Sequence, residues 1–174
     1  MTEQTQRLAS ADAKAPLQAM SREDFCGLID ECEGTLYNVA VAMLGNRADC
    51  LDAMQDTVLA AWRSLDGLRE PRYFKTWLTR ILINQCKRTL RRRRLVAPMG
   101  DAMSETLSAP APDEQAQALR AAVDALPERL RPVIVLYYYE DFAVEDIARA
   151  LGVPRGTVKS RLSKGRDILR RTVL

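Results

Sequence analysis

Apolar residues recur at steps of three and four from residue 21 to residue 65, which is the spacing of one helix face. In the first part of this stretch they are Phe25, Leu28, Ile29, Cys32 and Leu36, followed by Tyr37, Val41 and Leu44. Ser21, with Asp24 three residues later, has the spacing of a capping box and predicts a helix N-terminus. Gly45 and Asn46 predict the end of the helical region and a turn.

A second amphipathic helix is predicted from Asp49 to Leu65. One stripe of it carries the apolar residues Leu51, Met54, Val58, Ala61, Trp62 and Leu65. The opposite face is polar and contains Asp52, Gln55, Asp56 and Arg63. Residues 66–71 contain both Gly67 and Pro71 and therefore predict a loop.

A long basic helix is predicted from Tyr73 to about Arg94, and it contains no acidic residue. Its apolar positions are Phe74, Trp77, Leu78, Ile81 and Leu82. Residues 96–113 contain Pro98, Gly100, Ser104, Ser108, Pro110 and Pro112, a composition typical of an exposed, flexible linker. The sequence thus predicts a flexible N-terminal arm over residues 1–20, a first domain over 21–95, the linker, and a second domain over 114–174.

In the second domain, residues 133–139 could form a buried strand, because they are dense in Val, Ile, Leu and Tyr. A helix is favoured, because no partner strand is evident and the same residues fit a helical face. Its apolar face would contain Leu130, Val133, Ile134, Tyr137 and Tyr138. Residues 114–126 also favour helix through their Ala and Leu content. The predicted fold class is therefore all-α, with two small helical domains.

Residues 142–165 have the layout of a helix-turn-helix. A short helix would bury Ile147, Ala148 and Leu151, Gly152 would supply a turn with positive φ, and Pro154 suits the first turn of a second helix. Val153, Val158 and Leu162 would pack beneath that helix. The candidate DNA-binding residues on it are Arg155, Gly156, Thr157, Lys159, Ser160, Arg161 and Lys164. The N–H groups at its start near residues 155–157 could also receive a phosphate.

The formal net charge of +3 conceals alternating blocks. The net charge is zero over residues 1–20, −6 over 21–70, +9 over 71–94, −5 over 95–142 and +5 over 143–174. A single block of this kind is often no more than a solvated helix face. Two basic blocks, each inside its own helical pattern, favour binding to nucleic acid.

Composition excludes several kinds of chemistry. The chain has no His, which excludes imidazole acid/base catalysis, Ser-His and Cys-His nucleophile pairs and His-containing metal sites. Its four Cys residues form no C-x-x-C pair, so we expect reduced thiols on helix faces and no metal or other cofactor. No apolar run approaches the roughly 20 residues of a membrane span, and residues 1–20 lack the core of a signal peptide. A cytoplasmic location is predicted.

Aromatic and basic side chains are mixed at the start of the basic helix. Tyr73, Phe74 and Trp77 could stack on unpaired bases while neighbouring cations bind the backbone, as in single-strand binding. The alternative is that Phe74 and Trp77 pack into the core. Tyr73, at the edge of the loop, is expected to be exposed.

Four stretches together resemble a known family. They are residues 52–62 (Asp-Ala-Met-Gln-Asp-Thr-Val-Leu-Ala-Ala-Trp), 73–84 (Tyr-Phe-Lys-Thr-Trp-Leu-Thr-Arg-Ile-Leu-Ile-Asn), 126–131 (Leu-Pro-Glu-Arg-Leu-Arg) and 152–162 (Gly-Val-Pro-Arg-Gly-Thr-Val-Lys-Ser-Arg-Leu). In this order and spacing they resemble the extracytoplasmic-function (ECF) group of bacterial RNA polymerase sigma factors, in the sigma-70 superfamily. The resemblance covers about residues 22–172.

The resemblance implies a role in promoter recognition, strand opening and transcription initiation, with no catalysis. Asp52, Gln55 and Asp56 would bind the β′ clamp helices of core RNA polymerase, and the β flap is a further implied contact. The minus-10 element of promoter DNA would be bound by Arg72, Tyr73, Lys75, Asn84, Lys87, Arg88 and Arg91. Arg88 stands where many members carry Asp or Asn, so the minus-10 base preference does not carry over. The helix-turn-helix would bind the minus-35 element, and an anti-sigma factor is an implied partner that could hold the protein at the membrane.

Two other functions remain open from the residues themselves. A helix-turn-helix repressor or activator with a helical sensor domain would bind DNA without polymerase, usually as a dimer on a palindrome. Such a protein does not need the pair of stretches at 52–62 and 73–84. Nuclease-like metal chemistry on carboxylates alone is the third function, although the acidic residues lack a recognisable ligand cluster.

Overall fold

The computed structural model describes residues 20–68, 70–96 and 114–173, and every regular element in these ranges is helical, which confirms the predicted all-α class. The elements are α2 (Arg22–Leu44), α3 (Arg47–Arg63), η2 (Leu65–Gly67), η3 (Pro71–Tyr73), α4 (Phe74–Val96), α5 (Glu114–Asp124), α6 (Arg131–Tyr138), α7 (Val144–Leu151) and α8 (Arg155–Val173). Residues 1–19 of the predicted arm and residues 97–113 of the predicted linker lie outside the described residues.

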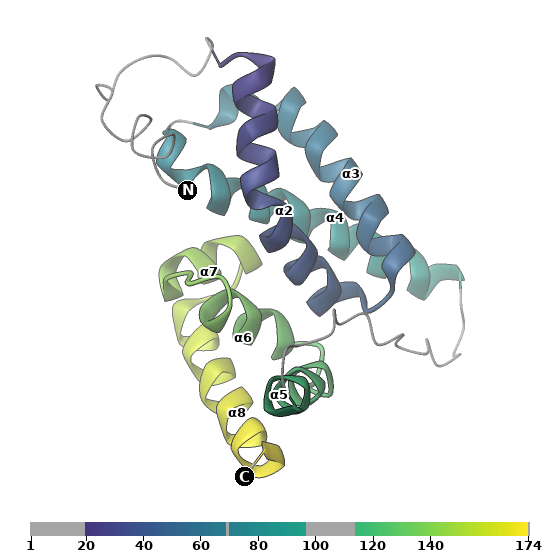
Figure 1. Cartoon of the computed structure of the whole chain (residues 1–174), viewed down its shortest axis with the longest axis vertical. Helices are drawn as coiled ribbons and strands as arrows, with labels where there is room; N and C mark the ends of the chain where they lie inside the picture. Colours follow the sequence, from purple (N-terminus) through teal and green to yellow (C-terminus); the bar gives the residue numbers. More distant parts are fainter. Residues whose placement is uncertain (1–19, 69, 97–113, 174) are drawn as a thin grey trace.

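The first domain consists of α2, α3 and α4, which all contact one another (Figure 1). Ser21 caps α2 with the predicted capping box, in which the hydroxyl accepts from the amide of Asp24 at 3.0 Å. The two apolar stretches before Gly45 form one continuous helix, since α2 ends only where Gly45 adopts a φ of +71°. Leu36, Leu78 and Leu82 are at most 1% exposed and lie in the core between the helices.

The segment between α3 and α4 is more ordered than the predicted loop. Two short 3-10 turns, η2 and η3, lie at its ends, and Pro71 begins the second of them, where its missing N–H removes no hydrogen bond. Leu68 is buried between them and anchors the segment to the core.

The second domain consists of α5, α6, α7 and α8. Residues 131–138 form a helix, which settles the ambiguity between helix and strand. Ile134 is 1% exposed and packs against α8 at Gly165, where an added Cβ would lie 2.8 Å from Ile134 Cδ1. Contrary to the predicted face, Tyr137 and Tyr138 are 38% and 48% exposed. Val135 and Leu136, in the same last turn, are buried instead, at 7% and 0% exposed.

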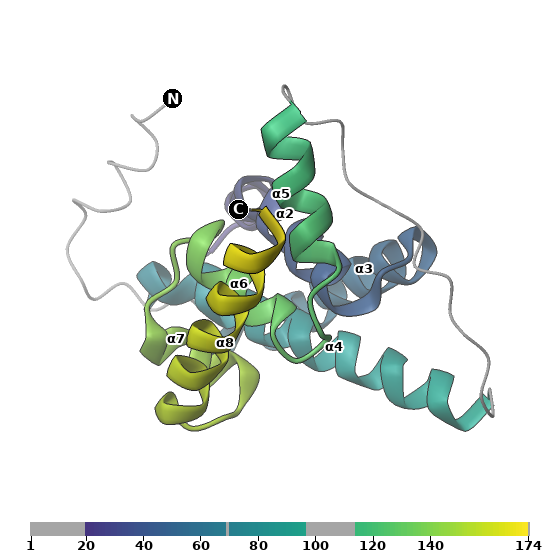
Figure 2. The same cartoon turned by 90° about the horizontal axis from the view of Figure 1, so that it is seen from below.

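The two domains lie against each other. α6 contacts α2 and α7 contacts α4, so the helix-turn-helix domain sits beside the basic helix (Figures 1 and 2). The C-terminal end of α4 extends past the second domain (Figure 2). Among the described helices, none has the length and apolar character needed to cross a membrane.

Candidate nucleic-acid interface

α4 divides its residues between the core and solvent. Leu78 and Leu82 are fully buried, because their four-residue spacing keeps them on the face that contacts α2 and α3. Asn84, Arg88 and Arg91, which sequence analysis assigned to the minus-10 element, are exposed. The helix therefore presents an amide and two guanidinium groups outward from a rigid apolar base.

The aromatic residues at the start of α4 have different roles. Phe74 is 3% exposed and packs edge-on against Phe25, with ring centres 6.0 Å apart, so it belongs to the core. Trp77 is half-buried, with its ring centre 5.8 Å from that of Phe74. Tyr73 is 40% exposed, as expected, and the Arg72 guanidinium lies 4.9 Å from its ring centre. Of the three aromatic candidates, Tyr73 is the one that offers an exposed ring to an unpaired base.

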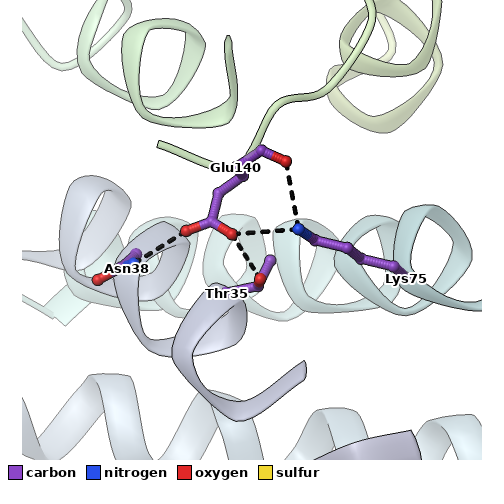
Figure 3. Close-up of polar contacts among 4 residues, drawn as sticks. All are labelled: Thr35, Asn38, Lys75 and Glu140. Atoms are coloured by element: carbon purple, nitrogen blue, oxygen red, sulfur yellow. Dashed lines mark hydrogen bonds and ion pairs between the residues drawn. The ribbon is translucent and has the colours of Figure 1, made fainter. Parts of the chain in front are cut away.

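The two lysines of the minus-10 set are bonded to the second domain. Lys75 Nζ donates to the backbone oxygen of Glu140 at 3.2 Å and lies 3.4 Å from its carboxylate (Figure 3). Lys87 Nζ donates to the backbone oxygen of Leu151 at 2.9 Å. Burial lowers the pKa of Lys87 below its ordinary value, and the charges of Arg91 and Arg80 lower it further. These contacts were not visible from the sequence.

The turn between α7 and α8 has the predicted construction. Gly152 takes a φ of +67°, and its N–H and that of Val153 donate to the backbone oxygen of Ala148. Leu151 and Val158, on either side of the turn, are buried. These hydrogen bonds and the buried residues on either side fix the backbone of the turn.

α8 presents the predicted polar face. Its candidate residues Arg155, Gly156, Lys159, Ser160 and Lys164 are exposed, and Thr157 and Arg161 are half-buried. The N–H of Thr157 donates to the backbone oxygen of Pro154 at 2.9 Å. Contrary to the prediction, this N–H is therefore not available to a phosphate. A phosphate at this helix start would be bound by the amides of Arg155 and Gly156.

α4 and the helix-turn-helix border one depression. An open depression of about 740 Å³ is lined by Arg80 of α4 and by Glu145, Ala148, Arg149, Gly152, Val153, Pro154 and Arg155. Arg155 pairs with Glu145, and Arg149 pairs with Asp146. These pairs reduce the repulsion that Arg80 would otherwise meet from the second domain.

The polar face of α3 is exposed at Asp52, Gln55 and Asp56, as predicted. Leu51 and Trp62, which were predicted to lie on the buried stripe, are 43% and 45% exposed, and Leu59 is 55% exposed. Periodicity identified the stripe, but its edge is only partly covered: the ring centre of Trp62 lies 5.0 Å from that of Phe25, and Trp62 is still partly exposed. This surface combines carboxylates with exposed apolar side chains, a mixture typical of protein–protein interfaces.

The thiols and carboxylates of the described residues form no cluster of three or more that could hold a metal ion. Cys26 is exposed, whereas Cys32, Cys50 and Cys86 are buried, and none is in a disulfide. Burial raises the pKa of Cys50 to about 11 and that of Cys86 to about 12. These two thiols behave as small core residues.

Comparison with known families matches the two domains separately. Residues 28–96 match Sigma-70 region 2, and residues 116–169 match Sigma-70, region 4. The RNA polymerase sigma factor SigV of Bacillus subtilis is 32% identical over 135 residues, which cover 77% of this chain and 81% of the relative. The ECF RNA polymerase sigma factor SigM of Mycobacterium tuberculosis is 32% identical over 165 residues, which cover 94% of this chain and 84% of the relative.

A solved structure is similar over both domains. It is the complex of the sigma factor RpoE with the anti-sigma factor NepR from Bartonella quintana. The TM-score is 0.71 at 26% identity, over 87% of this chain and 97% of that sigma factor. Since neither domain of this chain alone makes up 87% of it, the match includes α4 and the helix-turn-helix together.

Proposed function

The chain is an ECF sigma factor of the sigma-70 family, a non-catalytic factor that binds core RNA polymerase and promoter DNA in transcription initiation, and on that premise we propose which surface makes each contact. The repressor and nuclease alternatives fall away with this assignment. A match to region 2 and region 4 in one chain accounts for both of the stretches that a repressor does not need.

The first proposed contact is with core polymerase. Asp52, Gln55 and Asp56 bind the β′ clamp helices, and the exposed Leu51 and Leu59 lie on the same helix beside them. The exposed acidic residues disfavour direct contact with DNA at this surface, and the apolar side chains gain from burial against a protein. The second domain contacts the β flap.

The second and third contacts are with the promoter. Arg72, Tyr73, Lys75, Asn84, Lys87, Arg88 and Arg91 bind the minus-10 element as single strand, with Tyr73 as the stacking platform and a flipped base captured at a cost of a few kcal/mol. The helix-turn-helix binds the minus-35 element through α8. The observation that carries this division is the placement of one acidic and two basic surfaces on three different helices.

A partner and a location follow from the same premise. We propose that an anti-sigma factor binds this protein, supported by the similarity to a sigma factor that was captured with NepR. We also propose a cytoplasmic location, because core polymerase and promoter DNA are there. An anti-sigma factor inserted in the membrane would hold the inactive protein at its cytoplasmic face.

Run-off transcription with core polymerase and a promoter library tests the proposal. Addition of the protein is expected to produce new start sites that share a minus-10 and a minus-35 element. The control is core polymerase alone. If no new start sites appear while the protein alone shifts DNA strongly, the division of surfaces proposed here is wrong.

A further inference from the structure

A buried carboxylate joins the two domains. Glu140, in the segment between α6 and α7, is 8% exposed and lies between α2 and α4 (Figure 3). Its Oε2 accepts from Thr35 Oγ1 at 2.5 Å, and its Oε1 accepts from Asn38 Nδ2 at 2.9 Å. Lys75 Nζ lies 3.4 Å from Oε2. These four residues are called the Glu140 cluster, and its three other members all belong to the first domain.

The backbone conformation of the segment buries Glu140 and leaves the neighbouring acidic residue, Asp141, exposed. Asp141 has a φ of +56° and is exposed, whereas Glu140 points toward the first domain. The next residue, Phe142, is 7% exposed, and Lys75 Nζ lies 5.3 Å from its ring centre. One carboxylate of an adjacent pair is therefore placed in the interface and the other in solvent.

Both oxygens of the buried carboxylate are satisfied. A buried charge is costly unless it is paired and hydrogen-bonded, and removal of one partner leaves that cost uncompensated. The partners of Glu140 come from positions 102 and 105 residues away in the chain. The cluster therefore exists only while the two domains are together, and it contributes to holding them there.

The cluster and its neighbour engage cations that the proposed function assigns to DNA. Lys75 is bonded to the carboxylate and backbone oxygen of Glu140, and Lys87 is bonded to the backbone oxygen of Leu151. To an ammonium group, a carboxylate oxygen is a close substitute for a phosphate oxygen. While these bonds persist, each ammonium group has fewer N–H donors left for a phosphate oxygen.

We propose that Glu140 holds the free protein in a closed arrangement, in which the second domain occupies the two lysines of the minus-10 surface and opposes binding of single-stranded DNA. The inference rests on the proposed function through the assignment of Lys75 and Lys87 to phosphates. The occupant of the surface is the chain's own second domain. DNA must separate the domains before all of its phosphate contacts form, so the apparent affinity of the free protein is reduced by the fraction that is closed.

The first experiment measures the distance between the domains in the full chain. Cys26 is exposed and accepts one fluorophore, while the buried Cys32, Cys50 and Cys86 are protected from labelling. Thr172→Cys, at an exposed position near the end of α8, accepts the other. Glu140→Ala is expected to lower the energy-transfer efficiency, and Asp141→Asn is the matched control, because it removes a charge from the same segment outside the cluster.

The second experiment measures binding of a random-sequence single-stranded oligodeoxynucleotide to the free protein. Glu140→Ala is expected to tighten binding about tenfold, as the closed fraction falls. The plot of log affinity against log salt is expected to steepen by about 1.4, since each of the two released lysines adds about 0.7. Asp141→Asn is expected to change the affinity less than twofold.

A variant in α2, on the other side of the interface, controls for misfolding of the segment that contains Glu140. Thr35→Val removes a hydroxyl of α2 that donates to Glu140, and it is expected to give the same changes at smaller size. Unchanged energy transfer in both variants overturns the proposal, as does opening without tighter DNA binding. The start-site experiment with wild-type protein and core polymerase tests the proposed function without involving Glu140, so the two failures are distinguishable.

Discussion

The basic helices α4 and α8 have similar composition but different surroundings in the free protein. On α4, the ammonium groups of Lys75 and Lys87 donate to backbone oxygens of the second domain. On α8, Lys159 and Lys164 are exposed, and within the described residues neither forms an ion pair. The difference arises because α4 lies beside α7 of the second domain.

This difference suggests an order of events. In the proposed closed arrangement, the acidic face of α3, which we propose binds polymerase, and the polar face of α8, which we propose binds the minus-35 element, are both exposed. It engages the lysines of the minus-10 surface while leaving Asn84, Arg88 and Arg91 exposed. Polymerase and the minus-35 element can therefore be bound first. In the order that we propose, full contact with the minus-10 element, which accompanies strand opening, follows separation of the domains.

The prediction with the largest expected effect tests whether the acidic face of α3 binds protein rather than DNA. Asp56→Arg places a cation in the acidic face and should weaken binding to core polymerase by about 3 kcal/mol, or about a hundredfold, through like-charge contact. Fluorescence titration of core polymerase measures it. Duplex DNA binding by the free protein should stay within about twofold. An equal loss of both affinities would show that α3 and α8 do not have separate ligands.

The next effect compares the two basic helices directly. Arg161→Ala should weaken duplex promoter binding by the free protein by about 2 kcal/mol, or about thirtyfold, if Arg161 reads a base. Lys87→Ala should change it less than about twofold, because Lys87 is bonded to Leu151 in the free protein. Gel-shift titrations over several salt concentrations measure both variants. If Arg161 contacts only a phosphate, the salt slope should fall by about 0.9, and equal losses in the two variants would contradict the difference between the helices.

The elements were predictable because their signals are local. The capping box at Ser21, the turn at Gly152 and the buried Ile147 each depend on residues within a few positions. Of the aromatic residues, Phe74 follows its helical period into the core, and Tyr73 is exposed at the edge of the loop as expected.

The surroundings of each element were not predictable from local spacing. Periodicity placed Leu51, Trp62 and Tyr138 on apolar stripes, but exposure depends on whether another helix covers the edge of the stripe. The role of Glu140 depends on partners more than 100 residues away. A single sequence carries no local signal that separates Glu140 from the exposed Asp141.

A smaller effect tests the turn between α7 and α8. Gly152→Ala should lower the free energy of unfolding of the second domain by about 1 kcal/mol, because alanine is strained at a φ of +67° although the space is open. Native-state hydrogen exchange of α6, α7 and α8 measures it. Gly152→Asn is the control and should lose less, since asparagine tolerates this conformation. An equal loss in both variants would locate the cost outside the backbone.

The prediction with the smallest expected effect concerns the pH dependence of stability. All four Cys residues lie in the first domain, so ionisation of thiols at alkaline pH should destabilise that domain. Burial raises the pKa of Cys50 to about 11 and that of Cys86 to about 12, so the unfolded thiols, with pKa near 9.0, ionise first. Stability is retained below pH 9 and lost as pH rises toward these values. Between pH 8 and 10, each thiol should cost the first domain about 1 kcal/mol. Hydrogen exchange on α3 and α4 measures it. Cys86→Ala should be less stable than the wild type at pH 8, because it leaves a cavity, but its stability should fall less steeply as pH rises. An unchanged dependence of stability on pH would contradict the raised pKa of Cys86.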